Sequence, residues 1–268
     1  MFLVTLLQTN IQWAQPDENM RRAEALIAAN GGSDLYVLPE MWATGFATTP
    51  MEVPIDEKPL LWMQRMARQY DCAIAGSLAT HTAEGEYRNR HYFVTPLRSL
   101  KSEGGSQTSA LSPQTSALTY YDKHHLFTYG HEDQYFTPGS CHTIVEWRGV
   151  RILLLTCYDL RFPLWARYGQ AGEYDMIVCA ANWPESRQQP WRILTRARAI
   201  ENQCYLVGVN RVGDDAFCHY CGESLVCDSR GNTLAECAAN SEEAVTVALD
   251  FDALNTVRER FRVLDDRD

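Results

Sequence analysis

The chain has 268 residues, of which 46% are hydrophobic and 22% are charged, and its formal net charge at pH 7 is −10. That length fits one large α/β domain or two ordinary ones, and the hydrophobic share is enough for a sizeable core. The negative charge, with no basic stripe to neutralise phosphates, excludes nucleic acid as an expected partner.

Short apolar runs alternate with longer amphipathic stretches from the first residues onward. Residues 2–8 predict a β-strand and not a signal peptide, because they lack a basic start and a small-residue cleavage site. No apolar run approaches the ~20 residues that span a bilayer, so no membrane segment is expected. The further strands are expected at 34–38, 72–78, 91–97, 118–123, 150–156, 175–180, 204–210, 223–228 and 244–250. The helices are expected at 17–30, 57–70, 160–171, 188–202 and 251–262.

Near-continuous apolar strands that alternate with helices predict an α/β fold whose sheet is covered on both faces. No linker rich in proline or glycine divides the chain, so one domain over residues 1–268 is expected. The segment 99–118 stands apart, because it is rich in Ser, Thr, Gly and Gln and repeats the pentapeptide Gln-Thr-Ser-Ala-Leu at 107–111 and 114–118. We expect it to form an expanded surface hairpin without chemistry of its own.

The nine cysteines are odd in number and lack the regular spacing of a disulfide scaffold. Several lie inside apolar runs, as Cys179 does between Val178 and Ala180. Free thiols in such surroundings are typical of proteins from a reducing compartment. We therefore expect the protein to be cytoplasmic.

Cys157 lies between the apolar run 152–155 and a segment around Asp159 that has the features of a helix start. A thiol at such a junction is close to unpaired backbone N–H groups and to the positive end of a helix dipole. That environment is expected to lower the pKa of the thiol and to make it nucleophilic. Position alone leaves open the alternative that Cys157 is one more small buried residue.

A cysteine nucleophile that hydrolyses its substrate needs a base and a group that stabilises an oxyanion. Glu40 follows the apolar run 35–38 and Pro39, and it precedes Met41 and Trp42. In those surroundings its carboxyl group should be partly desolvated and able both to take and to give a proton near neutral pH. The alternative is an ordinary surface glutamate at the end of a strand.

Lys123 ends an aromatic-rich strand in a chain that otherwise uses arginine, with 3 lysines among its 24 basic residues. An ammonium group is a compact charge that can approach a carbonyl oxygen closely, whereas guanidinium is broad and planar. Lys123 is thus a candidate for holding an oxyanion. The alternative is a surface lysine whose alkyl stem lies on apolar neighbours.

Two other groups of residues offer competing chemistry. His124 and His125 follow Lys123, but adjacent side chains at a strand end point to opposite sides, so at most one of them can face the thiol. Cys218 and Cys221 form a C-x-x-C pair, but no second such pair exists to complete a four-ligand zinc site. We expect a structural role for this pair and no metal.

Taken together, three segments resemble the nitrilase superfamily of carbon–nitrogen hydrolases. They are Leu-Pro-Glu-Met at 38–41, Tyr-Asp-Lys-His-His-Leu-Phe at 121–127 and Cys-Tyr-Asp-Leu-Arg-Phe-Pro at 157–163, in the family order and with its long spacings. Matching stretches at 181–184, 196–203 and 210–213 extend the resemblance over essentially the whole chain. The third motif and the stretch 181–184 are most similar to the bacterial ω-amidase branch, whose members hydrolyse the terminal amide of 2-oxoglutaramate and 2-oxosuccinamate.

The resemblance implies a four-layer α-β-β-α sandwich with a catalytic triad of Glu40, Lys123 and Cys157. The family often carries a second glutamate in the loop after the lysine, and Glu132 is the matching residue, although Asp133 beside it leaves the register open. Members usually associate as dimers through helices that flank the site, so a homodimer or a higher homo-oligomer is expected. The expanded segment 99–118 departs from the compact hairpin of the family.

The chemistry that the resemblance implies needs no metal or organic cofactor. Glu40 takes the thiol proton, Cys157 attacks the carbonyl carbon of the amide substrate, and Lys123 with the backbone N–H of Tyr158 holds the oxyanion. Glu40 then returns the proton so that ammonia can leave, and it activates the water that hydrolyses the thioester.

An ω-amidase must also bind the distal carboxylate of its small substrate, a task that suits the two-pronged guanidinium of arginine. Arg187 is the candidate, and Tyr158 and Trp183 are expected to contact the substrate as well. Two alternatives stay open: another amidase, a carbamoylase or a nitrilase with the same triad, and a binding protein without catalysis on the same fold. The presence of all three triad side chains argues against the second.

Overall fold

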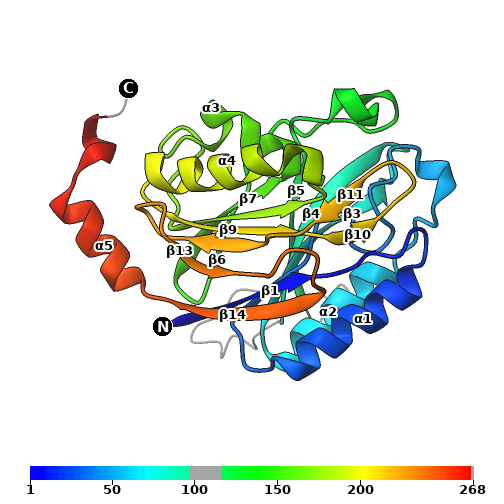
Figure 1. Ribbon diagram of the computed structural model, residues 1–268, viewed down its shortest axis with the longest axis horizontal. Coiled ribbons are helices and arrows are strands. Elements are labelled where there is room, and N and C mark those ends of the chain that lie inside the picture. The colour runs from blue at the N-terminus through cyan, green and yellow to red at the C-terminus, as the bar shows by residue number, and fades with distance from the viewer. Residues whose placement is uncertain (97–115, 267–268) are drawn as a thin grey trace, which may run out of the picture.

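The computed structural model describes residues 1–96 and 116–266, and these form two β-sheets that pack face to face (Figure 1). The first sheet contains, in spatial order, β14 (Glu243–Leu249), β1 (Phe2–Gln8), β2 (Leu35–Val37), β3 (Ala73–His81), β4 (Tyr87–Pro96) and β5 (Ser116–Asp122). The second contains β13 (Thr233–Glu236), β12 (Leu225–Cys227), β9 (Tyr205–Asn210), β8 (Met176–Ala181), β7 (Val150–Thr156) and β6 (Ile144–Trp147). A separate hairpin joins β10 (Val212–Asp214) to β11 (His219–Cys221).

Each sheet is parallel at its centre and antiparallel toward its edges. In the first sheet β1, β2 and β3 are parallel, and β14, β4 and β5 are added antiparallel to their neighbours. In the second sheet β7, β8 and β9 are parallel, and β6 and β12 flank them antiparallel. Central parallel strands are connected through helices, which must then lie on the faces of the sheets.

The helices cover the two outer faces, as Figure 1 shows. The first sheet is covered by α1 (Pro16–Ala29) and α2 (Lys58–Tyr70), and the second by α4 (Gln188–Glu201) with the short α3 (Pro163–Ala166). The last helix, α5 (Phe251–Arg260), follows β14 along the side of the sandwich. The four-layer α-β-β-α arrangement is therefore confirmed.

The core has three layers because the side chains of each central strand alternate between two faces. Leu6 of β1 and Leu154 of β7 belong to the central cluster between the sheets. Leu7 belongs to the cluster under α1 and α2, and Leu155 to the cluster under α4. All four side chains are fully buried. Burial on both faces explains why these strands are apolar runs without alternation.

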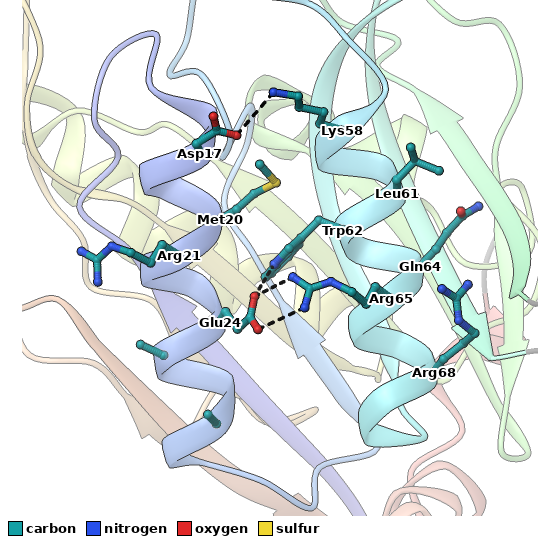
Figure 2. Close-up of a pocket in the computed structure, with 12 residues that line it drawn as sticks. Asp17, Met20, Arg21, Glu24, Lys58, Leu61, Trp62, Gln64, Arg65 and Arg68 are labelled. Atoms are coloured by element: carbon teal, nitrogen blue, oxygen red, sulfur yellow. Dashed lines mark hydrogen bonds and ion pairs between the residues drawn. The ribbon is translucent and has the colours of Figure 1, made fainter.

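The outer helices α1 and α2 are joined by one carboxylate. Glu24 of α1 accepts hydrogen bonds from Nε1 of Trp62 at 3.0 Å and from Arg65 at 2.7 Å, both on α2 (Figure 2). The indole ring of Trp62 is buried against Trp42, with ring centroids 4.9 Å apart. This contact fixes the helix pair against the loop that carries Glu40.

Most predicted elements are confirmed within a few residues, and the helix expected at 160–171 is wrong. That stretch contains the 3₁₀ segment η4 (Cys157–Arg161), the four-residue α3 and then irregular chain. Proline is tolerated only in the first turn of a helix and forces its preceding residue out of the helical region, so Pro163 starts a new short helix. This helix ends at Ala166 because Arg167 adopts extended backbone angles (φ −62°, ψ 122°), and Gly169 and Gly172, with φ of 91° and 106°, follow in the irregular chain.

Several short strands and all of the 3₁₀ segments were not predicted. The strands β6, β10, β11 and β13 have three or four residues each. The 3₁₀ segments are η1 (Pro50–Glu52), η2 (Thr128–Gly130), η3 (Glu132–Gln134), η4, η5 (Glu185–Arg187) and η6 (Val263–Asp266). Segments of this length seldom show a detectable hydrophobic period, although the three-residue strands β2 and β12 lie within predicted apolar runs.

Three remaining predictions concern the chain as a whole. All nine cysteines are free thiols, as expected. None of the helices in the described residues has the length and apolar character that crossing a bilayer requires. The hairpin predicted at 99–118 lies outside the described residues, except for the first residues of β5.

Candidate active site

The three residues of the predicted triad follow strands whose ends lie together. Glu40 lies in the loop after β2, Lys123 directly follows β5, and Cys157 directly follows β7. β2 and β5 run in the same direction in the first sheet, and β7 belongs to the second. Functional side chains of α/β proteins gather beyond the carboxyl ends of parallel strands.

Lys123 lies between two glutamates. Its Nζ atom donates to Oε1 of Glu40 at 2.7 Å and to Oε2 of Glu132 at 2.8 Å. The three side chains are completely buried. Asp133, in contrast, is exposed. The structure thus places Glu132, not Asp133, beside the lysine.

The electrostatics of this cluster keep the lysine charged. Burial by itself would lower the pKa of Lys123, but the adjacent Glu132 and Glu40 raise it overall. Burial raises the pKa of Glu132, while Lys123 opposes the shift and Glu40 adds to it. A hydrogen-bond donor to a buried carboxylate favours its ionised form.

One such donor is Asn89 of β4, which was not predicted. Its Nδ2 atom donates to Oε1 of Glu40 and to Oε1 of Glu132, both at 2.8 Å. The side chain is 1% exposed. The only sequence signal is an asparagine inside a strand, where this residue type is depleted.

Cys157 occupies a sharp turn between β7 and η4. Its φ is 44°, in the left-handed region that residues with a Cβ seldom adopt. The carboxylate of Asp159 holds this turn, since it accepts hydrogen bonds from the backbone N–H of Thr156 at 3.1 Å and of His125 at 2.9 Å. Tyr121 of β5 donates its hydroxyl to the same carboxylate at 2.8 Å. The two sheets together therefore position the thiol.

The predicted low pKa of Cys157 is wrong. The pKa of its thiol is raised well above the usual value, mainly by burial and also by the charge of Glu40, while Lys123 opposes the shift. A long helix with aligned dipoles does not follow the thiol, because η4 has five residues and α3 has four. Burial therefore favours the neutral form of this thiol.

Asn182, just after β8, links the thiol to the carboxylate. Sγ of Cys157 donates to the backbone carbonyl of Asn182 at 3.8 Å, and the backbone N–H of Asn182 donates to Oε2 of Glu40 at 3.0 Å. The side-chain amide of Asn182 donates to the carbonyl of Glu40 as well. The contacts with Glu40 are not visible in the sequence, because Asn182 is 142 positions from Glu40.

The two histidines after Lys123 have other partners. Nδ1 of His125 lies 2.9 Å from the carboxylate of Asp159, and its ring stacks on Phe162. Nδ1 of His124 lies 2.6 Å from the carbonyl of Gly139, and its ring stacks on Trp165. Among the described residues, the hydrogen bonds of both rings thus go to groups other than the thiol of Cys157.

A cavity of about 550 Å³ opens beside Cys157. The three predicted substrate-contacting residues, Tyr158, Trp183 and Arg187, all line it, and so does Arg161, which was not predicted. Trp183 connects the two arginines, because Arg161 lies 4.8 Å from its ring centroid and its indole N–H donates to the carbonyl of Arg187 at 2.6 Å.

Both guanidinium groups in the cavity rest on aromatic rings. Cζ of Arg187 lies 5.2 Å from the ring centroid of Phe127 and 5.8 Å from that of Tyr129. Across residues 1–96 and 116–266, neither Arg187 nor Arg161 forms an ion pair with a carboxylate. Stacking on a ring leaves the in-plane N–H donors of a guanidinium available for an anion.

No metal centre is found in the part of the chain that the structure describes, since no three His, Cys, Asp or Glu side chains there are grouped suitably. The C-x-x-C pair lies in the hairpin of β10 and β11, where Tyr220 and Cys221 are buried. His219 between the cysteines bonds to Asp214 and Asn240. The pair is part of this hairpin.

The model of the carbon–nitrogen hydrolase family matches residues 3–259 of this chain. The chain belongs to the carbon–nitrogen hydrolase family. This membership confirms the resemblance carried by the three motifs at Glu40, Lys123 and Cys157.

Known relatives match this carbon–nitrogen hydrolase over nearly its whole length. The omega-amidase YafV of Escherichia coli (strain K12) is 38% identical over 267 residues, which cover 99% of this chain and 96% of that protein. A 2-oxoglutaramate amidase of Bacillus subtilis (strain 168) is 31% identical and covers 98% of this chain and 96% of its own. The chain is therefore a carbon–nitrogen hydrolase that acts on amides.

Solved structures of the family agree with the fold. XC1258 of Xanthomonas campestris, a CN-hydrolase superfamily protein with an arsenic adduct in its active site, is 34% identical and has a TM-score of 0.88 over 100% of this chain and 97% of its own. Nit3 of Saccharomyces cerevisiae, a member of branch 10 of the nitrilase superfamily, has a TM-score of 0.80 at 20% identity over 97% and 94%.

Proposed function

We propose that this hydrolase cleaves the terminal amide of a small carboxylate substrate, of the 2-oxoglutaramate or 2-oxosuccinamate type, through a cysteine thioester. The observation that carries the proposal is a single cavity that holds Cys157 together with two guanidinium groups, those of Arg161 and Arg187, that have no carboxylate partner among the described residues. Relatives named omega-amidase and 2-oxoglutaramate amidase support the same substrate class.

The first step transfers the thiol proton. Glu40 uses Oε1 to accept hydrogen bonds from Lys123 and Asn89, and its Oε2 accepts the N–H of Asn182. Oε2 keeps a further lone pair that can accept a proton. Asn182, which donates to this oxygen, also accepts the hydrogen bond of the Cys157 thiol. Glu40 takes the proton through this oxygen while Sγ attacks the amide carbon, and the carbonyl electron pair moves to the oxygen.

The second step stabilises the oxyanion that results. Lys123 has three N–H donors, and its two glutamate partners use two of them. The third is available for the oxyanion, together with the backbone N–H of Tyr158 in the first turn of η4, which has no partner within that segment. Losing one such donor typically raises the barrier by about 2.7–4 kcal/mol.

The remaining steps release the two products. The protonated Glu40 gives its proton to the amide nitrogen, the C–N bond breaks and ammonia leaves the thioester on Cys157. Glu40 then takes a proton from water, the hydroxide adds to the thioester carbon, and the C–S bond breaks. The product carboxylate departs, and the thiol regains its proton.

The pocket supports a short anionic substrate. A guanidinium binds a carboxylate through two parallel hydrogen bonds, and we propose that Arg187, assisted by Arg161, holds the distal carboxylate. The aromatic rings of Phe127, Tyr129 and Trp183 then confine the carbon chain between the cations and the thiol. A cavity of about 550 Å³ is large enough for a small substrate.

The substrate class is tested by measuring ammonia release from 2-oxoglutaramate, from β-ureidopropionate and from a simple nitrile. We expect kcat/KM to be highest for 2-oxoglutaramate. Equal or greater activity on either competitor would overturn the ω-amide substrate. Cys157→Ala in the same assay separates enzymatic release from contamination, and Cys141→Ser, an exposed thiol outside the pocket, is the matched control.

Three further proposals concern the whole protein. A homodimer is supported by apolar side chains exposed on the helices beside the site: Leu164 of α3 is 74% exposed, and Ile193 and Ile200 of α4 are 56% and 48% exposed. The shared core of both sheets supports one domain over the chain. The nine free thiols support a cytoplasmic location. Sedimentation analysis of the purified protein tests the dimer.

A further inference from the structure

Asn89 uses its whole side-chain amide in the active site. Both hydrogens of Nδ2 are donated, one to Oε1 of Glu40 and one to Oε1 of Glu132, each at 2.8 Å. An NH₂ group donates and cannot accept a proton, so these contacts favour carboxylates in their ionised form. Asn89 therefore contacts the base and the second glutamate at once, and Lys123 is the other side chain that donates to both.

The orientation of this amide is fixed by Ser77 of β3. The hydroxyl of Ser77 donates to Oδ1 of Asn89 at 2.8 Å, and its oxygen accepts the backbone N–H of Met41 at 2.9 Å. The N–H of Met41 can only donate, so the hydroxyl hydrogen must point to Asn89. That arrangement makes Oδ1 the acceptor and turns the NH₂ group toward the glutamates. Both Ser77 and Asn89 are buried.

The chain of hydrogen bonds that orients Asn89 begins at the residue after Glu40. Met41 is the residue after Glu40, and its φ of 42° lies in the left-handed region. The chain of hydrogen bonds runs from its backbone through Ser77 and Asn89 back to the carboxylate of Glu40. The loop that carries the base is thus tied to the amide that orients it.

We propose that Asn89 is a positioning residue that holds Glu40 and Glu132 ionised and turned toward Lys123, and that Ser77 sets the orientation of its amide. This inference rests on the proposed function, in which Glu40 accepts the thiol proton. The titratable groups that face the amide are Glu40 and Glu132, with the ammonium of Lys123 shared between them and the thiol of Cys157 beyond it.

The test compares Asn89→Ala, Asn89→Asp and Ser77→Ala with the wild type. Asn89→Ala removes both donors, and Asn89→Asp replaces them with acceptors. We expect kcat to fall about 100-fold in Asn89→Ala and further in Asn89→Asp. The acid limb of the kcat/KM profile should move about one pH unit upward, because the carboxylates lose donors that favour ionisation. Ser77→Ala should show a smaller shift in the same direction.

Asn202→Ala is the matched control for losing a buried asparagine. Asn202 is fully buried, and within the described residues its side chain bonds to two backbone groups, those of Arg198 and Tyr168. Its loss should lower the melting temperature and leave the pH profile unchanged. A purely structural role for Asn89 would give the same result as this control, and that outcome would overturn the proposal. If Asn89→Asp does not fold, the pH profile of kcat/KM for Ser77→Ala provides the test of the proposal.

A second measurement does not depend on the substrate. The rate at which iodoacetamide alkylates Cys157, followed by mass spectrometry from pH 5 to 9, reports proton transfer from the thiol to Glu40. We expect the rate in Asn89→Ala to rise at higher pH than in the wild type. If the wild type releases ammonia from none of the amides, the proposed substrate is wrong, and the alkylation profiles still test Asn89. Superimposable profiles would refute the positioning role.

Discussion

Lys123 donates a 2.8 Å hydrogen bond to Glu132, a residue nine positions further along the chain, and both side chains are completely buried. The same ammonium donates to Glu40 at 2.7 Å. A charge-assisted hydrogen bond in a buried site is stronger than its counterpart in water. Glu132 therefore shares in fixing the lysine that we propose as the oxyanion donor.

Glu132→Gln tests this relationship, with Asp133→Asn as its neighbour control. Gln keeps the shape of the side chain but loses the charge that orients Lys123. A hydrogen bond to a charged group contributes about 1.5–3 kcal/mol, so kcat should fall about 10- to 100-fold. Asp133 is exposed, and Asp133→Asn should keep wild-type kcat. Steady-state kinetics of both variants, with melting curves to verify folding, provide the measurement. Equal kcat of Glu132→Gln and Asp133→Asn would show that Glu132 does not contribute to catalysis.

The two pocket arginines are expected to act on binding of the substrate carboxylate. Arg187→Gln and Arg161→Gln should raise KM for an ω-amide that bears a carboxylate by about tenfold or more, because each removes a charge-assisted pair. A neutral amide of the same length should be affected much less. Arg230→Gln changes an exposed arginine in the turn between β12 and β13 and should leave KM unchanged. An equal rise in KM for charged and neutral amides would argue against carboxylate binding.

The sequence predicted the residues that lie at strand exits. Glu40, Lys123 and Cys157 each follow an apolar strand, and both the strand and its end are local signals. Local signals do not show whether Glu132 or Asp133 is the second glutamate's counterpart, because the choice depends on which side chain of an irregular loop turns inward. The resemblance narrowed the choice to these two, and burial in the folded chain decides between them.

The parts that could not be predicted depend on contacts between distant segments. Asn89 and Asn182 meet Glu40 from positions 49 and 142 residues away. The pKa of Cys157 was predicted from the local junction alone, whereas burial in the whole fold raises it. Arg161 lies four residues after Cys157, inside the third motif, and it lines the pocket at the end of the short η4 segment that replaced the expected helix.

His91 should make the stability of the protein depend on pH. Burial lowers the pKa of this histidine from 6.5 to about 4, against the opposing effects of the Leu155 carbonyl and Asp159. Below pH 6.5 the unfolded chain takes up a proton that the folded protein does not, so the free energy of unfolding falls as the pH drops toward 4. The loss from this group between pH 7 and 4.5 should be about 2–3 kcal/mol.

His91→Gln removes that titration and can still donate to the carbonyl of Leu155. Urea unfolding at pH 7 and pH 4.5 should therefore show a smaller pH-dependent loss in His91→Gln than in the wild type. His81→Gln, at an exposed position on β3, is the control and should retain the wild-type dependence. The same loss in all three proteins would mean that His91 does not stay neutral in the folded state.

Gly139 holds the end of the Lys123 strand in place. Its N–H donates to the carbonyl of Lys123 at 2.9 Å, and a Cβ at this position would collide with the backbone carbonyl of Asp122. Gly139→Ala should lower the free energy of unfolding by about 1–3 kcal/mol through overpacking. It should also reduce kcat by at least about tenfold, because it displaces the chain that carries the lysine.

Gly31→Ala is the control for Gly139→Ala, since a Cβ there would meet no atom within 4 Å. Its stability should stay within about 0.5 kcal/mol of the wild type, with unchanged kcat. Urea unfolding and steady-state kinetics measure both quantities. Gly139→Ala tests whether the strand end positions Lys123: if the variant loses stability but keeps full kcat at temperatures where it is folded, the ammonium is placed by its two glutamates alone and not by the backbone beneath it.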